Sequence, residues 1–147
     1  MAAVMMDSMR DTYAMLARRM ELFHGLTPED VARIFSRGST REYDDGEHIF
    51  EKGQPGAEMF VILGGEVRIF DGPQEIALLT RGDMFGEMAL VSNESRSASA
   101  AATCTTSLLV LSLDDLKKDL PREVSLQLLV NIIITLSERL RRANTDG

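Results

Sequence analysis

Apolar side chains near the start of the chain recur at helical spacing. Their separations alternate between three and four residues, which places them on one stripe of an α-helix. The stripe consists of Met6, Met9, Tyr13, Leu16, Met20 and Phe23. We predict a helix that packs this stripe on the rest of its own domain, with a short coiled-coil seam as the alternative.

A second, shorter helix is predicted after Gly25. Thr27 suits the N-cap, Pro28 suits the first turn, and Asp30 would sit near the positive end of the helix dipole. The buried face of this helix would be Val31, Ile34 and Phe35.

The middle of the chain changes to short runs of β-branched and aromatic residues between turn signals such as Asp45-Gly46 and Gly64-Gly65. A turn about every ten residues is typical of an antiparallel sandwich or barrel. The predicted strands are His48 to Phe50, Met59 to Leu63, Val67 to Phe70, Ile76 to Leu79, Ser97 to Ala102 and Leu108 to Ser112. Between the fourth and fifth strands, Phe85 to Arg96 breaks this rhythm with a helix-friendly stretch, and such interruptions tend to carry function.

The last part of the chain is helical again. Asp114 and Asp115 would open a short helix, and Arg122 to Arg142 reads as one long helix after Pro121. The polar residues between positions 126 and 136 form one narrow stripe, namely Gln127, Asn131 and Thr135. Because a surface helix has a broader polar face, we expect cover on two sides, the second from another copy of the chain. The seam of this homodimer, within residues 124–143, would be Leu126, Leu129, Ile133, Leu136 and Leu140.

The predicted fold is therefore α+β and mainly β: an antiparallel jelly-roll barrel flanked by N-terminal helices and a long C-terminal helix. The expected parts are residues 1–37 (helices), 38–112 (jelly roll) and 113–147 (helices), all within one domain.

The composition argues against several classes of function and site. Sixteen Lys and Arg against 23 Asp and Glu give a net charge of −7, which argues against a general nucleic-acid binder. A single cysteine, Cys104, excludes an intrachain disulfide and a cysteine-based zinc site, and we interpret it as an inert thiol. His24 and His48 lack further ligands at metal-binding spacing, so we expect no metal site.

The chain also lacks several familiar signals. We find no nucleophile, Walker or Rossmann motif and expect no enzyme. No signal peptide and no apolar run of about 20 residues is present, so we expect a cytoplasmic protein without a membrane segment. No helix-turn-helix follows Arg142, and we expect no direct DNA binding.

A series of short motifs, in order, resembles the cyclic nucleotide-binding domains of catabolite-activator-type regulators, kinase regulatory subunits and nucleotide-gated channels. The resemblance covers about residues 22–142. The matching segments are Leu22 to Leu26, Asp45 to Phe50, Lys52-Gly53, Met59 to Val67, Gly82 to Leu90 and Arg96 to Ala98.

The last two segments suit a cyclic nucleotide chemically. The planar fork of Arg96 matches two phosphate oxygens, and a helix beginning at Gly86 would add free backbone N–H groups. Gly86 has no side chain, so a ligand could approach its backbone closely. Ionised Glu87 only accepts hydrogen bonds, which suits the ribose 2′-hydroxyl.

The resemblance implies further roles, within a phosphate-binding cassette at residues 82–97. The amides of Ala89 and Ser97 would complete the phosphate contacts, and Ser97 after the arginine favours cyclic AMP over cyclic GMP. Ile69 and Leu79 would line the apolar part of the pocket, and Asn144 falls where relatives contact the base.

We therefore expect a cyclic AMP sensor that acts through its C-terminal helix on an unidentified downstream protein. Two alternatives remain open. One is the sensor part of a transcription regulator whose DNA-binding part is absent, and the other is a nucleotide-free dimerisation or docking module.

Overall fold

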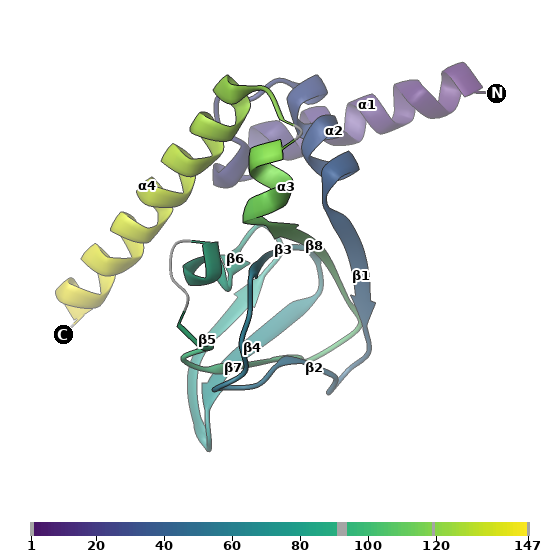
Figure 1. The fold of residues 1–147 in the computed structure, drawn as a ribbon. Helices are drawn as coiled ribbons and strands as arrows, with labels where there is room; N and C mark the ends of the chain where they lie inside the picture. The colour runs from purple at the N-terminus through teal and green to yellow at the C-terminus, as the bar shows by residue number, and fades with distance from the viewer. Residues whose placement is uncertain (1, 91–93, 119, 147) are drawn as a thin grey trace. The chain divides into compact units, whose positions relative to one another are not determined.

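The computed structural model describes residues 2–90, 94–118 and 120–146 (Figure 1). The chain forms two compact units. The helical unit comprises Met1–Ser36 and Lys117–Gly147, and the β unit comprises Arg37–Leu116.

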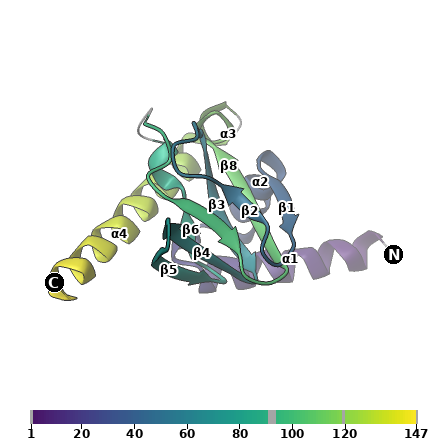
Figure 2. The ribbon, with the colours of Figure 1, turned by 90° about the horizontal axis from the view of Figure 1, so that it is seen from below.

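The β unit is built from two four-stranded sheets in which all paired strands are antiparallel. One sheet has the order β1-β8-β3-β6 and the other β2-β7-β4-β5. The strands are β1 (Ser39–Tyr43), β2 (His48–Phe50), β3 (Glu58–Gly64), β4 (Glu66–Asp71), β5 (Gln74–Thr80), β6 (Met84–Phe85), β7 (Ser99–Ala102) and β8 (Thr106–Ser112). The β4–β5 hairpin is clear in Figure 1, and Figure 2 shows it from below.

The predicted fold class is confirmed, with one correction. Because no strand pairing among the described residues joins the two sheets, the jelly roll is a sandwich and not a closed barrel. Both sheets contribute to its core, which consists of Phe60, Ile62, Phe85, Leu108 and Val110 from one sheet and Val67 and Ala100 from the other.

Sequence patterns missed two strands. Four of the five side chains of β1 are exposed, so this edge strand has no apolar alternation to reveal it, although it pairs with β8 from Ser39↔Val110 to Tyr43↔Thr106. The strand β6 has only two residues, and the second of them, Phe85, is the first residue of the predicted break. The fifth predicted strand also begins later than expected, at Ser99.

The helical unit begins with α1 (Ala2–Arg19), which ends before the last two positions of the predicted stripe, Met20 and Phe23. Met20 is extended, with φ −97° and ψ 124°, and a 3-10 turn, η1 (Glu21–Phe23), follows. Leu16, Met20 and Phe23, the last three positions of the stripe, are nevertheless buried. The side chains of Met6 and Met9 lie outside the described residues.

The helix α2 (Pro28–Arg37) starts as predicted. The N–H of Asp30 donates to Thr27 Oγ1, and the N–H of Thr27 donates to a carboxylate oxygen of Asp30, both at 3.1 Å. This reciprocal cap satisfies two backbone donors at the helix start. Val31 and Ile34 are fully buried, whereas Phe35 is half-buried against Tyr13, with ring centroids 5.4 Å apart.

The end of the chain contains α3 (Leu113–Lys118) and the long α4 (Arg122–Asp146). The polar stripe on α4 has a partner within the chain. Asn131 is 3% exposed, and its Nδ2 donates to the carbonyls of Leu22 (2.7 Å) and His24 (2.8 Å) at η1. Gln127 Nε2 donates to Asn131 Oδ1 at 3.0 Å, so the stripe joins α4 to the N-terminal segment.

None of the helices in the described part of the chain is long and apolar enough to cross a membrane.

Candidate functional site

The segment after β6 carries the predicted ligand residues. Gly86 has φ +75°, a left-handed conformation that glycine adopts readily. The helix expected to begin there is a 3-10 turn of four residues, η2 (Glu87–Leu90), and not an α-helix. Such a short element has little dipole, so charge in this site must come mainly from side chains.

The backbone of Arg96 is fixed by the turn that connects β2 to β3. Its N–H donates to the carbonyl of Gln54 at 2.9 Å, and its carbonyl accepts from the N–H of Gly53 at 2.8 Å. These two hydrogen bonds fix the position from which the Arg96 side chain extends, next to the turn that follows β2.

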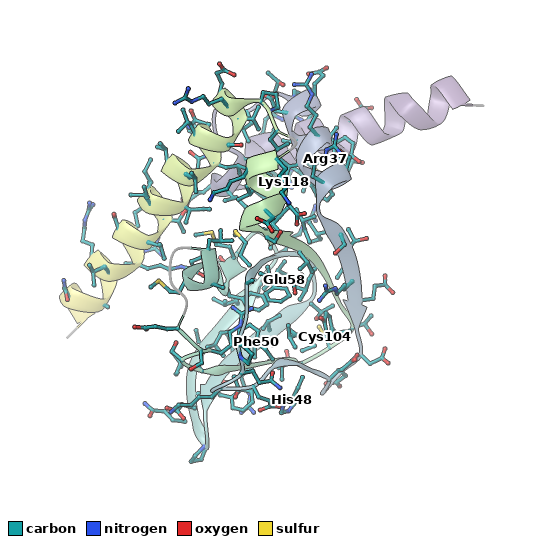
Figure 3. All side chains as sticks on the ribbon, in the orientation of Figure 1. Arg37, His48, Phe50, Glu58, Cys104 and Lys118 are labelled. Carbon is teal, nitrogen blue, oxygen red and sulfur yellow. The ribbon has the colours of Figure 1, made fainter. Side chains whose placement is uncertain are left out.

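The guanidinium of Arg96 is held by two backbone carbonyls and an aromatic ring. Nη1 donates to the carbonyl of Gly86 at 3.2 Å, and Nη2 donates to the carbonyl of Glu58 at 2.8 Å. Its Cζ lies 4.2 Å from the ring centroid of Phe50. Phe50 and Glu58, labelled in Figure 3, come from β2 and from the start of β3.

One donor of this guanidinium is buried without a partner. Among the described residues, Nε of Arg96 has no hydrogen-bond acceptor. Burial lowers the pKa of Arg96, while the nearby carboxylates of Glu58 and Glu87 act in the opposite direction. A guanidinium remains charged under these conditions, so the site presents a partly desolvated cation whose buried Nε has no acceptor among the described residues.

Glu87 is the first residue of η2, is 8% exposed and is engaged in an interaction within the chain. A buried carboxylate close to a held guanidinium offers an acceptor beside a set of donors. This combination suits a ligand that carries both a hydroxyl and an oxyanion.

The two predicted amide contacts differ. The N–H of Ala89 donates to the carbonyl of Gly86 at 3.2 Å, the same carbonyl that accepts from Arg96 Nη1. Ser97 is exposed and lies in a bend just before β7. The proposed phosphate contacts of both residues remain predictions.

The three predicted lining residues fall in different places. Ile69 on β4 and Leu79 on β5 are half-buried against the core of the β unit. Asn144 is an exposed residue of α4, in the helical unit. The roles of Ile69 and Leu79 in lining the pocket and of Asn144 in contacting the base also remain predictions.

Sequence reasoning missed Phe50, Gly56 and Glu58 as neighbours of the arginine. A Cβ atom placed on Gly56 would lie only 2.3 Å from Arg96 Nε. The carboxylate of Glu58 accepts from Arg41 Nη2 at 3.1 Å while its carbonyl holds Arg96. The signal that could have drawn attention to this loop is the turn sequence Gln54-Pro55-Gly56.

The residues set aside earlier lie elsewhere on the surface. His48 Nδ1 pairs with Glu51 Oε1, and Cys104 is an exposed free thiol. Asp44, Asp45 and Glu47 are exposed in the turn after β1.

Several known proteins are similar to this chain in sequence and in fold. A family model described as "Cyclic nucleotide-binding domain" matches residues 40–121. The cyclic AMP receptor protein of Thermus thermophilus is 40% identical over 133 residues, which cover 85% of this chain and 59% of that protein. A cAMP-dependent protein kinase regulatory subunit of Mycosarcoma maydis is 34% identical over 101 residues, which cover 66% of this chain and 19% of that protein.

A solved structure is also similar. The cyclic nucleotide-binding domain from Methylobacillus flagellatus KT matches with a TM-score of 0.81 and 27% identity, over 95% of this chain and 83% of that one. The two relatives named above are a receptor and a regulatory subunit, so the similarity extends to regulatory proteins. The family match spans more than half of the sequence and includes Gly86, Glu87 and Arg96. This chain belongs to the cyclic nucleotide-binding domain family.

Proposed function

We propose that this chain is a regulatory module that binds cyclic AMP. The observation that carries the proposal is the guanidinium of Arg96, which is held in place by the protein while its buried Nε has no acceptor among the described residues. A phosphodiester supplies two oxygens that match the fork of an arginine.

Each residue of the site has a role in this proposal. Arg96 binds the phosphate, and Glu87 accepts the hydrogen bond of the ribose 2′-hydroxyl. Gly86 allows the ligand to approach the backbone, and the amides of Ala89 and Ser97 donate to the phosphate. Because the Ala89 amide donates to Gly86 in this structure, binding would require it to share or exchange that bond.

Preference for cyclic AMP over cyclic GMP rests on Ser97 and on the similarity to a cyclic AMP receptor protein. Calorimetric titration with cyclic AMP and then cyclic GMP tests it directly. We expect saturable binding of both, tighter for cyclic AMP. If neither nucleotide gives a binding signal in the titration, the result would favour the nucleotide-free docking module.

A second proposal concerns α4, which we propose forms a homodimer with the α4 helix of another copy. Val124, Leu128 and Ile132 are buried, whereas the predicted seam has Leu126, Ile133 and Leu140 at 53%, 61% and 64% exposure. These positions follow the spacing of a two-helix contact, and removing them from water favours association. A second copy carries the same seam and can pair with it symmetrically.

Sedimentation at micromolar concentration tests the dimer. We expect a dimer for the parent chain and a monomer for Ile133→Glu, because a carboxylate buried in the seam would cost several kcal/mol. Ser137→Glu adds the same charge at another exposed position of α4 and should remain dimeric. A monomeric parent chain would refute this interface.

The signalling output is proposed to pass through α4. We expect cyclic AMP to slow amide hydrogen exchange between residues 137 and 144. Deleting residues 143–147 should weaken cyclic AMP binding more than cyclic GMP binding, if Asn144 contacts the base. Unchanged exchange in α4, together with protection at residues 86–97, would mean that the chain binds nucleotide without moving this helix.

A further inference from the structure

We infer that Phe50 and Gly56 are positioning residues that hold the guanidinium of Arg96 ready for an anion before any ligand arrives. This inference rests on the proposed function, because it concerns the arginine assigned to the phosphate. Phe50, Gly56 and the carbonyls of Glu58 and Gly86 are called the arginine cradle below.

Gly56 leaves the space that the guanidinium occupies. A Cβ atom at this position would lie 2.3 Å from Nε and 2.5 Å from both Cζ and Nη2 of Arg96. Gly56 is not among the glycines with positive φ, so an alanine there would fit the backbone. The clash would fall on the far end of a flexible side chain, and Gly56→Ala should displace the guanidinium without unfolding the protein.

Phe50 supports the guanidinium with its ring. The Cζ atom of Arg96 lies 4.2 Å from the ring centroid of Phe50, within the range of a cation–π contact. The ring belongs to an aromatic cluster, because its centroid lies 5.8 Å from that of Phe60 and 6.0 Å from that of Phe85. Packing on both neighbours restricts the ring, which in turn restricts the arginine.

The two carbonyls then determine which donors remain. A guanidinium has five N–H donors, and the carbonyls of Gly86 and Glu58 engage one on each Nη atom. Among the described residues, the buried Nε of Arg96 has no acceptor. An arginine that is already ordered loses less conformational freedom on binding, so Phe50 and Gly56 should strengthen binding through their effect on Arg96.

A pair of matched controls makes the inference testable. Gly64 also lacks a positive φ, and a Cβ atom there would meet no atom within 4 Å. Phe70 makes a similar contact with Arg68, whose Cζ also lies 4.2 Å from the ring centroid. Both of these residues are on β4. Gly64→Ala is therefore the control for Gly56→Ala, and Phe70→Leu is the control for Phe50→Leu. Both controls make the same kind of change away from Arg96.

Calorimetry with cyclic AMP gives the first readout. We expect Gly56→Ala to weaken binding about tenfold or more and Phe50→Leu about fivefold, with both controls within about twofold of the parent. Phe50→Tyr keeps the ring and should restore most of the affinity. If the parent binds cyclic AMP and Gly56→Ala binds it equally well, the inference is overturned while the proposed function stands.

The second readout needs no ligand. In ¹⁵N NMR spectra of the ligand-free chain, we expect the Nε–H signal of Arg96 to be displaced from its free position by the Phe50 ring and to exchange slowly with water. Gly56→Ala and Phe50→Leu should move it toward the free position, whereas Gly64→Ala should not. An Nε–H signal that is the same in all variants overturns the inference, even if the parent fails to bind cyclic AMP. Dispersed backbone amide signals in each spectrum establish that the variant is folded.

Discussion

Arg96 in the β unit and Asn131 in the helical unit both donate hydrogen bonds to backbone carbonyls. They differ in whether a polar atom of the side chain remains without a partner. The amide of Asn131 donates to Leu22 and His24 and accepts from Gln127, all within 3.0 Å. The guanidinium of Arg96 donates to two carbonyls and keeps a buried Nε without an acceptor among the described residues.

This difference separates a structural polar group from a candidate ligand group. A buried polar side chain whose partners all lie in the chain stabilises the fold, and its removal leaves those partners unsatisfied. A buried charge with donors still available is costly by itself and gains from a bound anion. Stability should therefore depend on Asn131, and nucleotide affinity on Arg96.

The largest effect is expected for Asn131→Ala. The substitution leaves the carbonyls of Leu22 and His24 without their donor, which should lower the free energy of unfolding by about 3 kcal/mol. Urea denaturation followed by circular dichroism measures the loss. Ser137→Ala, an exposed position on the same helix, should stay within about 0.5 kcal/mol of the parent. A loss below about 1 kcal/mol for Asn131→Ala would remove the contrast with Arg96.

Arg96→Ala should act on binding instead. We expect cyclic AMP binding to weaken by at least about 2 kcal/mol, or about thirtyfold, because the phosphate loses its charged partner. The free energy of unfolding should change by less than about 1 kcal/mol, since a partly desolvated charge is removed as well. Arg68→Ala removes an arginine that lies over the ring of Phe70, on β4, and should leave the calorimetric affinity unchanged.

Glu87→Ala should have a smaller effect on binding. Only a neutral hydroxyl loses its acceptor, so we expect cyclic AMP to bind about 1 to 2 kcal/mol more weakly. A 2′-deoxy analogue lacks that hydroxyl and should bind the variant and the parent about equally. If the analogue still distinguishes the two proteins in calorimetry, Glu87 acts on some other part of the ligand.

The smallest effect is expected for Gln127→Ala. Asn131 Oδ1 loses a donor, while its two bonds to the N-terminal carbonyls remain, so stability should fall by only about 1 kcal/mol. The double variant with Asn131→Ala should lose little more than Asn131→Ala alone, because the two residues share one network. Additive losses in urea denaturation would show that Gln127 acts independently.

The family motif indicated the candidate site residues, but not the surroundings of Arg96. Gly86, Glu87 and Arg96 could be chosen because their residue types suit a cyclic nucleotide at that spacing. The helix expected to begin at Gly86 is a 3-10 turn at Glu87–Leu90, and a helix-friendly run of five residues does not define the type of turn. Phe50 and Gly56 were missed because nothing in their local sequence links them to a residue 40 or more positions later.

Sequence alone determined the features that depend on near neighbours. The Thr27–Asp30 cap is made within one turn, and the predicted strands follow from alternation and turn residues, which act over a few positions. Tertiary structure decided the features that depend on backbone carbonyls far away in the chain. Asn131 reaches a carbonyl 109 residues earlier, and Arg96 reaches one 38 residues earlier. Every residue has the same backbone carbonyl. The residue types in the sequence therefore do not indicate which carbonyl will accept from Asn131 or Arg96 in the folded chain.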